Sequence, residues 1–431
     1  MPTFAIITLG CKVNAYESEC YAESLKALNY TEAKPSEAAD IYIINTCTVT
    51  NTAAQKSRQK IHFAQRQNPD ALICVVGCLV QTQKEMDTEG IDVLIGATHK
   101  NELALRVDES YRTHQKFLLI DDISRPVPFE DLSMKVFAHK TRAFLKIEDG
   151  CNQFCSYCTI PFARGRERSL QLEKVRQYAE TLKENGHREI VLTGIHTGRY
   201  HDEEGHTLID VLRMLVEIGI PRIRISSIEI TEITDEIIEF IKEHKQMARH
   251  LHIPLQAGSN HVLKQMNRPY SREEYLERIL FIQKEIPGIA IGTDIITGFP
   301  NESEEDFLES MNAVEEGKLV YLHVFPYSLR SGTVAARMKG HLDAQTKKDR
   351  SKRLIALGEK KKEEYFRSFL GKELEVLFEE EKNSGEWIGH SSEYIPVTVK
   401  SEEPLHSRMF TVRITEASPD GLKGETVDEI E

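Results

Sequence analysis

Short apolar runs alternate with longer amphipathic stretches along most of this chain, and few folds are compatible with that pattern. In the first part of the sequence, helical patterns separate apolar runs at residues 4–9, 41–44, 71–76 and 93–95. Continuous apolar runs between helices are typical of parallel strands that are covered on both faces. Residues 1–105 are therefore predicted to form a doubly wound α/β domain with a parallel sheet.

A linker is predicted over residues 106–138, because two aspartates and two prolines interrupt the alternation there. A second series then follows, with predicted strands at 143–147, 189–192, 222–225, 250–253, 290–296 and 320–325. Its predicted helices include residues 172–184, 208–217 and 275–284. Such a series suits a partial (β/α)6 barrel over residues 139–366, with functional side chains at the carboxyl ends of the strands.

The C-terminal part changes character after a basic stretch at residues 347–367, which predicts a helix. Glycine, proline and serine then separate short apolar segments at residues 374–378, 387–389, 394–399 and 410–414. These segments predict a small all-β barrel over residues 367–431. The predicted fold class is thus α/β, with two parallel-sheet units followed by an all-β domain.

Composition limits the cellular setting and the chemistry. The 431 residues include 8 cysteines and carry a formal net charge of -13. No apolar run reaches the roughly 18 residues that a membrane-spanning helix needs, and the N-terminus lacks a basic segment, so a cytoplasmic protein with no membrane partner is expected. Spaced cysteines in such a protein indicate metal binding or catalysis rather than disulfides. The acidic average argues against a nucleic-acid partner.

Three cysteines, Cys151, Cys155 and Cys158, follow the first predicted strand of the barrel with the spacing Cys-x3-Cys-x2-Cys. Three thiolates on one tight loop can bind three irons of a [4Fe–4S] cluster and leave the fourth iron open. The alternative is structural zinc, which requires four ligands, and no fourth cysteine or histidine follows at zinc-finger spacing. The loop therefore favours an iron–sulfur cluster.

Three further cysteines occupy equivalent places in the N-terminal domain. Cys11, Cys47 and Cys78 each end a predicted strand. The carboxyl ends of neighbouring parallel strands meet at one edge of a sheet, so these cysteines are expected to converge and hold a second cluster with an open iron. The alternative is three ordinary buried cysteines, which is the reading given to Cys20 and Cys74.

Cys-x3-Cys-x2-Cys with Tyr157 before its last cysteine resembles the radical S-adenosylmethionine superfamily. With the second triad, the whole chain resembles the methylthiotransferase family of radical enzymes, which has a TRAM-type terminal barrel. The segments that carry this resemblance are GCKVNAYES at residues 10–18, NTCTVTNTA at 45–53 and CTIPFARGRERS at 158–169. They are similar to the bacterial branch that modifies N6-threonylcarbamoyladenosine in tRNA. The isopentenyl-adenosine branch usually has Gln-Met in place of Lys12-Val13 and Arg-Glu in place of Thr50-Asn51.

The resemblance implies two [4Fe–4S] clusters and S-adenosylmethionine as both methyl donor and radical source. It implies that the C2 hydrogen of N6-threonylcarbamoyladenosine at tRNA position 37 is replaced by a methylthio group. Cys11, Cys47 and Cys78 would hold the sulfur that is methylated, and the other triad would generate the radical. The expected partners are tRNA and an electron donor such as flavodoxin or ferredoxin, with the sulfur donor unknown. The alternatives are an isopentenyl-adenosine or ribosomal-protein aspartate substrate, or a non-enzymatic iron–sulfur protein that binds RNA.

Several residues at predicted strand ends are expected to bind S-adenosylmethionine. Thr193 and Gly194 match the place where radical enzymes bind the methionine amino group, although a plain turn has the same sequence. The methionine carboxylate is assigned to Arg224 and Ser226. The resemblance implies that Tyr157 also binds the cofactor. It places Gln256 in a segment facing the cofactor, and Gly298 and Glu302 in a segment that contacts its adenine.

The overall negative charge argues against an RNA partner, but basic residues gather locally where RNA could bind. The candidate RNA contacts are Arg58, Arg164, Arg166, Arg168, Lys360 and Lys361. Arginine near the radical cluster is favoured because its planar guanidinium matches phosphate, whereas helical lysines are commonly a solvated face. The terminal domain has 15 acidic against 6 basic residues over 368–431, which makes it a poor phosphate binder.

Overall fold

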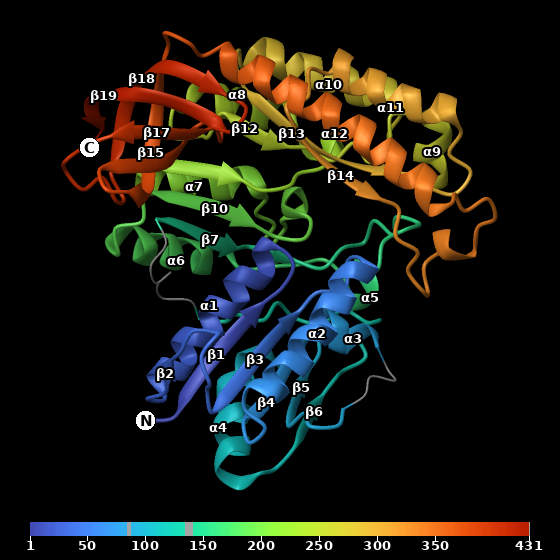
Figure 1. The fold of residues 1–431 in the computed structure, drawn as a ribbon, viewed down its shortest axis with the longest axis vertical. Helices are drawn as coiled ribbons and strands as arrows, with labels where there is room; N and C mark the ends of the chain where they lie inside the picture. Colours follow the sequence, from blue (N-terminus) through green and yellow to red (C-terminus); the bar gives the residue numbers. More distant parts are fainter. Residues whose placement is uncertain (84–87, 134–140, 431) are drawn as a thin grey trace.

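The computed structural model describes residues 1–83, 88–133 and 141–430. Its N-terminal layer is a parallel six-stranded sheet in the order β2-β1-β3-β4-β5-β6. The central strands are β1 (Thr3–Thr8), β3 (Ile41–Thr46), β4 (Leu72–Gly77) and β5 (Val93–Ile95). The covering helices are α1 (Lys12–Ala27), α2 (Asn51–Gln67), α3 (Cys78–Thr82) and α4 (Leu103–Thr113). The predicted doubly wound domain is confirmed (Figure 1).

This sheet extends into residues that the sequence pattern assigned to a linker. Strand β6 (Phe117–Leu119) pairs with β5, and α4 runs to Thr113, so β6 and most of α4 lie within the predicted linker of 106–138. At the other edge, β2 (Thr31–Glu32) adds a strand that was not predicted. Both edge strands are short, and neither is fully buried, so they lack the continuous apolar run that marks the inner strands.

The second unit consists of two parallel three-stranded sheets, β11-β10-β7 and β12-β13-β14. Their strands are β7 (Arg142–Lys146), β10 (Glu189–Thr193), β11 (Arg222–Ile225), β12 (His250–His252), β13 (Ala290–Thr297) and β14 (Tyr321–Pro326). Bridges between Ile223 and Met247 and between Ser227 and His252 join the two halves. The structure therefore has the predicted succession of six parallel strands in a partial barrel.

Helices α6 (Leu172–Glu184), α7 (Leu208–Ile218), α8 (Asp235–Glu243), α10 (Arg272–Glu285) and α11 (Glu304–Glu316) cover this barrel. Local sequence fixes their ends. Thr207 and Asp210 form a capping box at the start of α7, and Gly219 ends it in a left-handed conformation. Ser303 and Asp306 form the same box in α11. Among the described residues, no helix has the length and apolarity needed to cross a membrane.

Helix α12 (Ala344–Arg367) leads into a closed five-stranded barrel in the order β15-β16-β17-β19-β18. Its strands are β15 (Glu373–Asn383), β16 (Glu386–Ser391), β17 (Pro396–Lys400), β18 (Met409–Ser418) and β19 (Gly421–Ile430). The sequence pattern missed β19, because its outward positions are acidic and only Leu422 is fully buried in the core. Phe378, Trp387 and Phe410 pack in that core.

Candidate active site

The three N-terminal cysteines converge at the carboxyl edge of the first sheet. Cys11 follows β1, Cys47 follows β3 and Cys78 follows β4. Gly10, with φ of +102°, lies so close to Cys47 that a Cβ on the glycine would sit 2.9 Å from the Cys47 Sγ. Burial raises the pKa of the Cys47 thiol to about 11, with further increases from Cys78 and Cys11. The topology therefore brings together thiols that lie far apart in sequence.

The second triad occupies the loop between β8 (Glu148–Asp149) and α5 (Ile160–Arg164). Backbone N–H groups of Gln153 and Ile160 donate to the sulfurs of Cys151 (3.3 Å) and Cys158 (3.4 Å). Burial raises the pKa of the Cys158 thiol to about 12, and neighbouring Cys155 raises it further. N–H groups aimed at sulfur stabilise a bound thiolate, so the loop is shaped for a metal cluster.

A buried ion network joins the two triads. Arg164, on α5 beyond Cys158, donates to Glu17 of α1 at 2.9 Å and to Asp149 at 3.2 Å. Glu17 also accepts from Lys100 (2.8 Å) and Lys146 (3.0 Å). The side chain of Arg164 is 1% exposed and that of Glu17 is 0% exposed. Charges from both domains thus meet in one place with no access to water.

The network carries more positive than negative charge. Burial opposes ionisation of Glu17, but Arg164, Lys100 and Lys146 hold the pKa of its carboxyl well below the ordinary value. Burial likewise opposes the charge on Arg164, and Glu17 and Asp149 raise its pKa. The sulfurs of Cys78 and Cys11 are near enough to contribute to the same effect. Surplus buried cations favour an anionic cluster at the neighbouring thiols.

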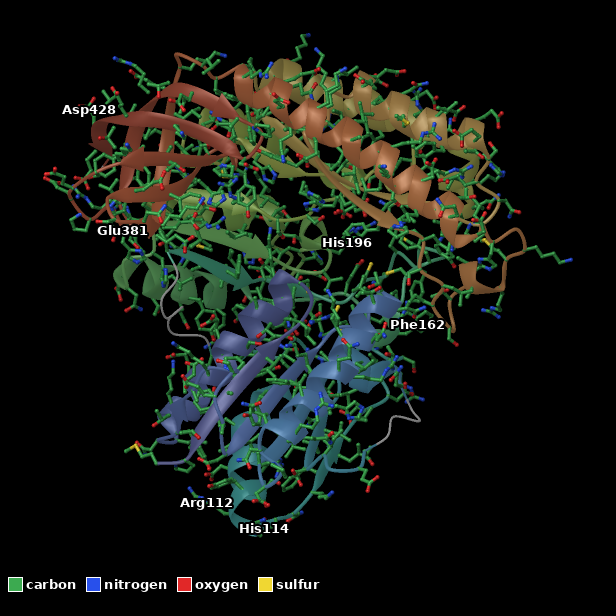
Figure 2. The ribbon with its side chains drawn as sticks, viewed as in Figure 1. Arg112, His114, Phe162, His196, Glu381 and Asp428 are labelled. Atoms are coloured by element: carbon green, nitrogen blue, oxygen red, sulfur yellow. The ribbon has the colours of Figure 1, made fainter. Side chains whose placement is uncertain are left out.

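Asn14 ties this network to the first triad. Its amide donates to the carbonyls of Leu9 (2.7 Å) and Thr46 (3.0 Å), the residues at the ends of β1 and β3. Its side-chain carbonyl accepts from Arg164 at 2.6 Å. One side chain therefore holds two cysteine-bearing strand ends and the helix that follows the other triad. Figure 2 shows the side chains of the molecule, with Phe162 of that helix and His196 labelled.

Both triads suit iron–sulfur clusters with one open iron. Each supplies three free cysteines, and none of the described cysteines forms a disulfide. Cys11 and the three cysteines of the barrel loop are at least partly accessible, so a ligand can reach each site. Bound there, a cluster with three thiolates would leave one iron free to bind a further ligand.

Comparison with known proteins agrees with this architecture. Residues 3–96 match the Uncharacterized protein family UPF0004, 145–314 match the Radical SAM superfamily and 367–427 match the TRAM domain. The chain is 42% identical to the threonylcarbamoyladenosine tRNA methylthiotransferase MtaB of Bacillus subtilis, over 100% of this chain and 98% of that protein. The chain belongs to the methylthiotransferase family of radical S-adenosylmethionine enzymes.

Other relatives of this methylthiotransferase differ in the substrate that they are named for. The MtaB protein of Aquifex aeolicus is 38% identical over 88% of this chain and 93% of its own length. The tRNA-2-methylthio-N(6)-dimethylallyladenosine synthase of Dictyoglomus thermophilum is 36% identical over 100% of both chains. The radical methyltransferase TsrM of Kitasatospora setae, with 13% identity and a TM-score of 0.52 over 75% of this chain and 72% of its own, shares the fold.

As a radical enzyme, the methylthiotransferase uses S-adenosylmethionine and an iron–sulfur cluster. Gly194, after β10, lies against Glu148: a Cβ at the glycine would sit 2.8 Å from the Glu148 Oε2. The Glu148 Oε1 is buried and has no hydrogen-bond partner among the described residues. Glu148 precedes the loop that carries Cys151, Cys155 and Cys158, which we call the radical triad. An unpartnered carboxylate oxygen beside this triad fits a cationic group such as the methionine ammonium.

Among the other residues predicted to bind the cofactor, some lie near this region. Thr193 is buried at the end of β10, and Ser226 lies 3.3 Å from the hydroxyl of Thr197. Tyr157 packs edge-on against Phe299. Gln256 has a φ of +67° and exchanges backbone hydrogen bonds with β13 at Asp294 and Ile296.

Arg224 and Glu302 are placed differently from the prediction. Arg224 donates to Glu189 at 2.8 Å and to the carbonyls of Ser391 and Ser392, so its guanidinium fastens the barrel to the terminal domain. Burial opposes ionisation of Glu189, but Arg224 and Arg222 lower its pKa to about 2.

Glu302 accepts from the N–H of Gly298 (2.7 Å) and from Arg350 (2.5 Å), which closes the loop after β13. A Cβ at Gly298 would collide with the side chain of Lys347. The polar groups of Arg224 and Glu302 are thus committed to partners within the protein.

Two residues near the radical triad were not predicted. His196 lies 3.6 Å from the Cys151 sulfur through its Nδ1, and Arg268 donates to the Cys155 sulfur at 3.3 Å. Burial lowers the pKa of His196, but hydrogen bonds with Cys151 and Glu167 raise it to about 12. Extending the strand-end argument two residues past Gly194 would have found His196. Arg268 gives no local signal, since it follows α9 (Asn260–Gln265), far along the chain from Cys155.

The structure changes the set of candidate RNA contacts. Arg164 is buried in the ion network, so it is corrected to a structural role. The side chain of Arg168 is 8% exposed and donates to Asp149, and Lys361 pairs with Glu315. The more exposed candidates bind protein groups too: Arg58 donates to Gln83, and Lys360 lies 3.8 Å from Glu364.

Arg166 is also exposed, and within the described residues its side chain makes no hydrogen bond or ion pair. Its guanidinium lies 4.8 Å from the ring centroid of Phe154, within the cysteine loop. Phe154 in turn meets Phe162 edge-on, with 6.1 Å between ring centroids. Both rings are exposed, at 38% and 55%, beside the radical triad.

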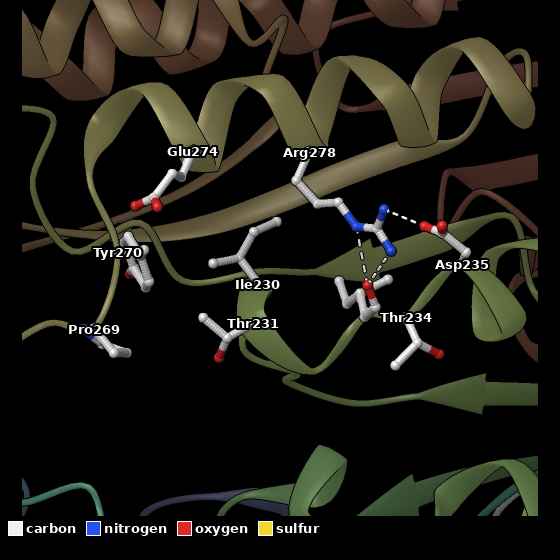
Figure 3. A pocket seen from close by; sticks show the side chains of 9 residues that line it. Ile230, Thr231, Thr234, Asp235, Pro269, Tyr270, Glu274 and Arg278 are labelled. Carbon is white, nitrogen blue, oxygen red and sulfur yellow. Dashed lines mark hydrogen bonds and ion pairs between the residues drawn. The ribbon is translucent and has the colours of Figure 1, made fainter.

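A separate pocket lies on the outside of the barrel, between the turn after β11 and α10. It contains none of the predicted site residues. Figure 3 shows Arg278 reaching across it to the carbonyl of Ile233 and to Asp235. These bonds satisfy the guanidinium and connect α10 to the start of α8.

Proposed function

We propose that this enzyme adds a methylthio group to C2 of N6-threonylcarbamoyladenosine at position 37 of tRNA. The observation that carries the proposal is the 42% identity, over the full chain, with a protein named for that reaction. The converging cysteines Cys11, Cys47 and Cys78 support it, because a sulfur-transferring enzyme needs a second site beside the radical centre. We assign a second [4Fe–4S] cluster to that triad.

The bound cofactor and clusters would supply the radical chemistry that an unactivated aromatic C–H bond requires. The protein contributes position and exclusion of water. Arg164, Glu17 and Asp149 fix the distance between the two triads through buried bonds. We assign the methionine ammonium to Glu148, whose Oε1 is buried and unpartnered among the described residues, and we assign Arg268 and His196 to supporting the sulfurs of Cys155 and Cys151.

The exposed platform formed by Phe154, Phe162 and Arg166 supports RNA as the substrate. Aromatic rings stack on unpaired bases whatever their sequence, and a neighbouring arginine adds phosphate attraction. A base of the anticodon loop must leave its stack to reach an enclosed site, which exposes the adjacent bases to such a platform. The platform thus gives the acidic chain a local RNA contact beside its radical centre.

Nucleoside analysis tests the proposal. In a strain from which the gene is deleted, tRNA digests should lose the 2-methylthio derivative of N6-threonylcarbamoyladenosine and regain it on complementation. Loss of the methylthio derivative of dimethylallyladenosine instead would favour the second candidate, for which the Dictyoglomus thermophilum relative is named. Unchanged levels of both nucleosides would refute the proposed tRNA reaction.

A further inference from the structure

Arg330 lies in the loop after β14 and joins the barrel to the N-terminal domain. Its guanidinium donates to the side-chain carbonyl of Asn51 at 2.6 Å and to the hydroxyl of Thr48. Thr48 directly follows Cys47, so these bonds hold the guanidinium beside a cysteine of the first triad. Arg330 is 9% exposed and Thr48 is 0% exposed, so this positive charge is kept away from water.

Arg330 differs from the other buried arginines because no acidic residue in the described part of the chain pairs with it. Its two hydrogen-bond partners are uncharged oxygens, and its Nε is buried without a partner among the described residues. The other buried arginines each pair with a carboxylate: Arg164 with Glu17, Arg222 and Arg224 with Glu189, and Arg350 with Glu302. A buried charge without a counterion is costly, so Arg330 is suited to an anion that comes from outside the polypeptide.

The second cluster, which we assigned to Cys11, Cys47 and Cys78, is an anion of the required kind. Each thiolate ligand contributes a negative charge, and the cluster becomes more negative when it accepts an electron. Burial lowers the pKa of Arg330, and the Cys47 sulfur opposes that effect. An RNA phosphate is a less suitable counterion, because a guanidinium buried to this degree is not accessible to a nucleic-acid backbone.

We infer that Arg330 is a counterion of the second cluster and stabilises its reduced, more negative state. The inference rests on the proposed function, which assigns a cluster to this triad. Arg164 also acts on the triad, but its charge is shared with Glu17 and Asp149. Arg330 supports the cluster rather than contacting the substrate, so it is a positioning residue contributed by the barrel.

A redox titration of the second cluster tests the inference. Full-length Cys155→Ala is reconstituted, so that the cluster at the first triad is the one that remains, and is titrated with dithionite and followed by electron paramagnetic resonance. One electron passes from dithionite to the cluster, and no bond breaks. Adding Arg330→Gln should shift this equilibrium about tenfold towards the oxidised cluster, which lowers the potential by about 59 mV. Arg330→Lys keeps the charge and should restore most of the shift.

Arg337→Gln is the matched control. Arg337 lies further along the same loop and is exposed, so solvent screens its charge and the potential should stay at the value of the parent Cys155→Ala protein. A purely structural link between the domains predicts a different pattern. Lysine and glutamine at position 330 would then lower the unfolding free energy alike and leave the potential unchanged, which would overturn the inference.

The outcomes separate this inference from the proposed function. A reducible cluster whose potential ignores Arg330 would refute the inference and leave the function standing; if tRNA binding in Arg330→Gln also loses salt dependence, the counterion is a phosphate. Absence of any cluster in Cys155→Ala, with Arg330 intact, would refute the second cluster on which the proposed function depends. Should Arg330→Gln fail to take up iron, normal iron in Arg330→Lys would support the counterion, and equal loss in both would overturn it.

Discussion

The two cysteine triads bring three thiols together by opposite routes. Cys151, Cys155 and Cys158 lie on a single loop, so their spacing is encoded within eight consecutive residues, 151–158. Cys11, Cys47 and Cys78 lie at three strand ends, and only the parallel order of β1, β3 and β4 brings them together. One ligand set is local, whereas the other exists only once the sheet has formed.

This difference also separates the ways in which the two sites are held. Backbone N–H groups of the loop itself support the radical triad. The N-terminal triad depends on Asn14 and on the ion network that spans both domains. Damage to tertiary structure should therefore affect the dispersed triad before the local one.

The largest expected effect comes from removing one cysteine of each triad. Cys155→Ala should abolish formation of 5′-deoxyadenosine from S-adenosylmethionine, and with it all methylthiolation. Cys47→Ala should keep the cleavage and lose the methylthio product. Product analysis by mass spectrometry on reconstituted enzyme measures both. Loss of cleavage in Cys47→Ala, with wild-type iron in the barrel loop, would contradict the division of labour.

A second substitution tests the link between the triads. Arg164→Met removes the cation that acts most strongly on Glu17 and one of the cations that pair with Asp149, and breaking a buried pair costs about 3 to 5 kcal/mol. Chemical denaturation of the apoprotein should show that loss. The exposed pair of Arg213 and Glu236 provides a control, since Arg213→Met should cost under about 1 kcal/mol. Equal effects of the two substitutions would show that burial of the network contributes nothing.

Lowering the pH should weaken the buried ion network that joins the two triads. The pKa of Glu17 is held below its ordinary value in the folded protein, so its stabilisation is present above about pH 4.5 and is lost as the pH falls towards the folded pKa. A carboxylate of this kind contributes about 2 kcal/mol. Unfolding free energies measured from pH 6 down to pH 3 should fall more steeply in wild type than in Glu17→Gln.

Candidate ligands and core residues could be predicted from the sequence where their positions follow a short-range rule. The local triad and the inner strands were predicted because spacing and continuous apolar runs are visible in a single window. The convergence of Cys11, Cys47 and Cys78 was predictable because parallel strand ends share an edge. The short edge strands β2 and β6 and the acidic strand β19 lack that signal.

Charged residues were the least predictable, because their roles depend on partners far along the chain. Arg164 was predicted as an RNA contact, yet its partners Glu17 and Asn14 lie in the other domain. Arg224 pairs with Glu189 and with carbonyls of the terminal domain. Single-sequence patterns show that an arginine stands near a motif, but they do not show whether a carboxylate from elsewhere will bury it.

A glycine directly precedes one cysteine of each triad, so the two sites can be perturbed separately. Gly150, with φ of +86°, precedes Cys151, and a Cβ there would sit 2.0 Å from the carbonyl oxygen of Arg166. At Gly10 the added Cβ would meet the Cys47 side chain at 2.8 Å. Each alanine substitution should cost about 1 to 3 kcal/mol of local strain. Iron content and cleavage assays should show that Gly150→Ala impairs the radical triad and Gly10→Ala the other; the reverse pattern would refute the assignment.

The smallest effect is expected far from both triads, at a lysine that the sequence placed among the RNA contacts. Lys361 on α12 pairs with Glu315 and Glu364, both partly exposed to water. Solvent screens such pairs, so Lys361→Ala should change the unfolding free energy by less than about 1 kcal/mol. Because its charge is already balanced, tRNA affinity should also stay unchanged, whereas Arg166→Ala should weaken binding and flatten its salt dependence. A larger loss in Lys361→Ala than in Arg166→Ala would move the RNA path from the cysteine loop to α12.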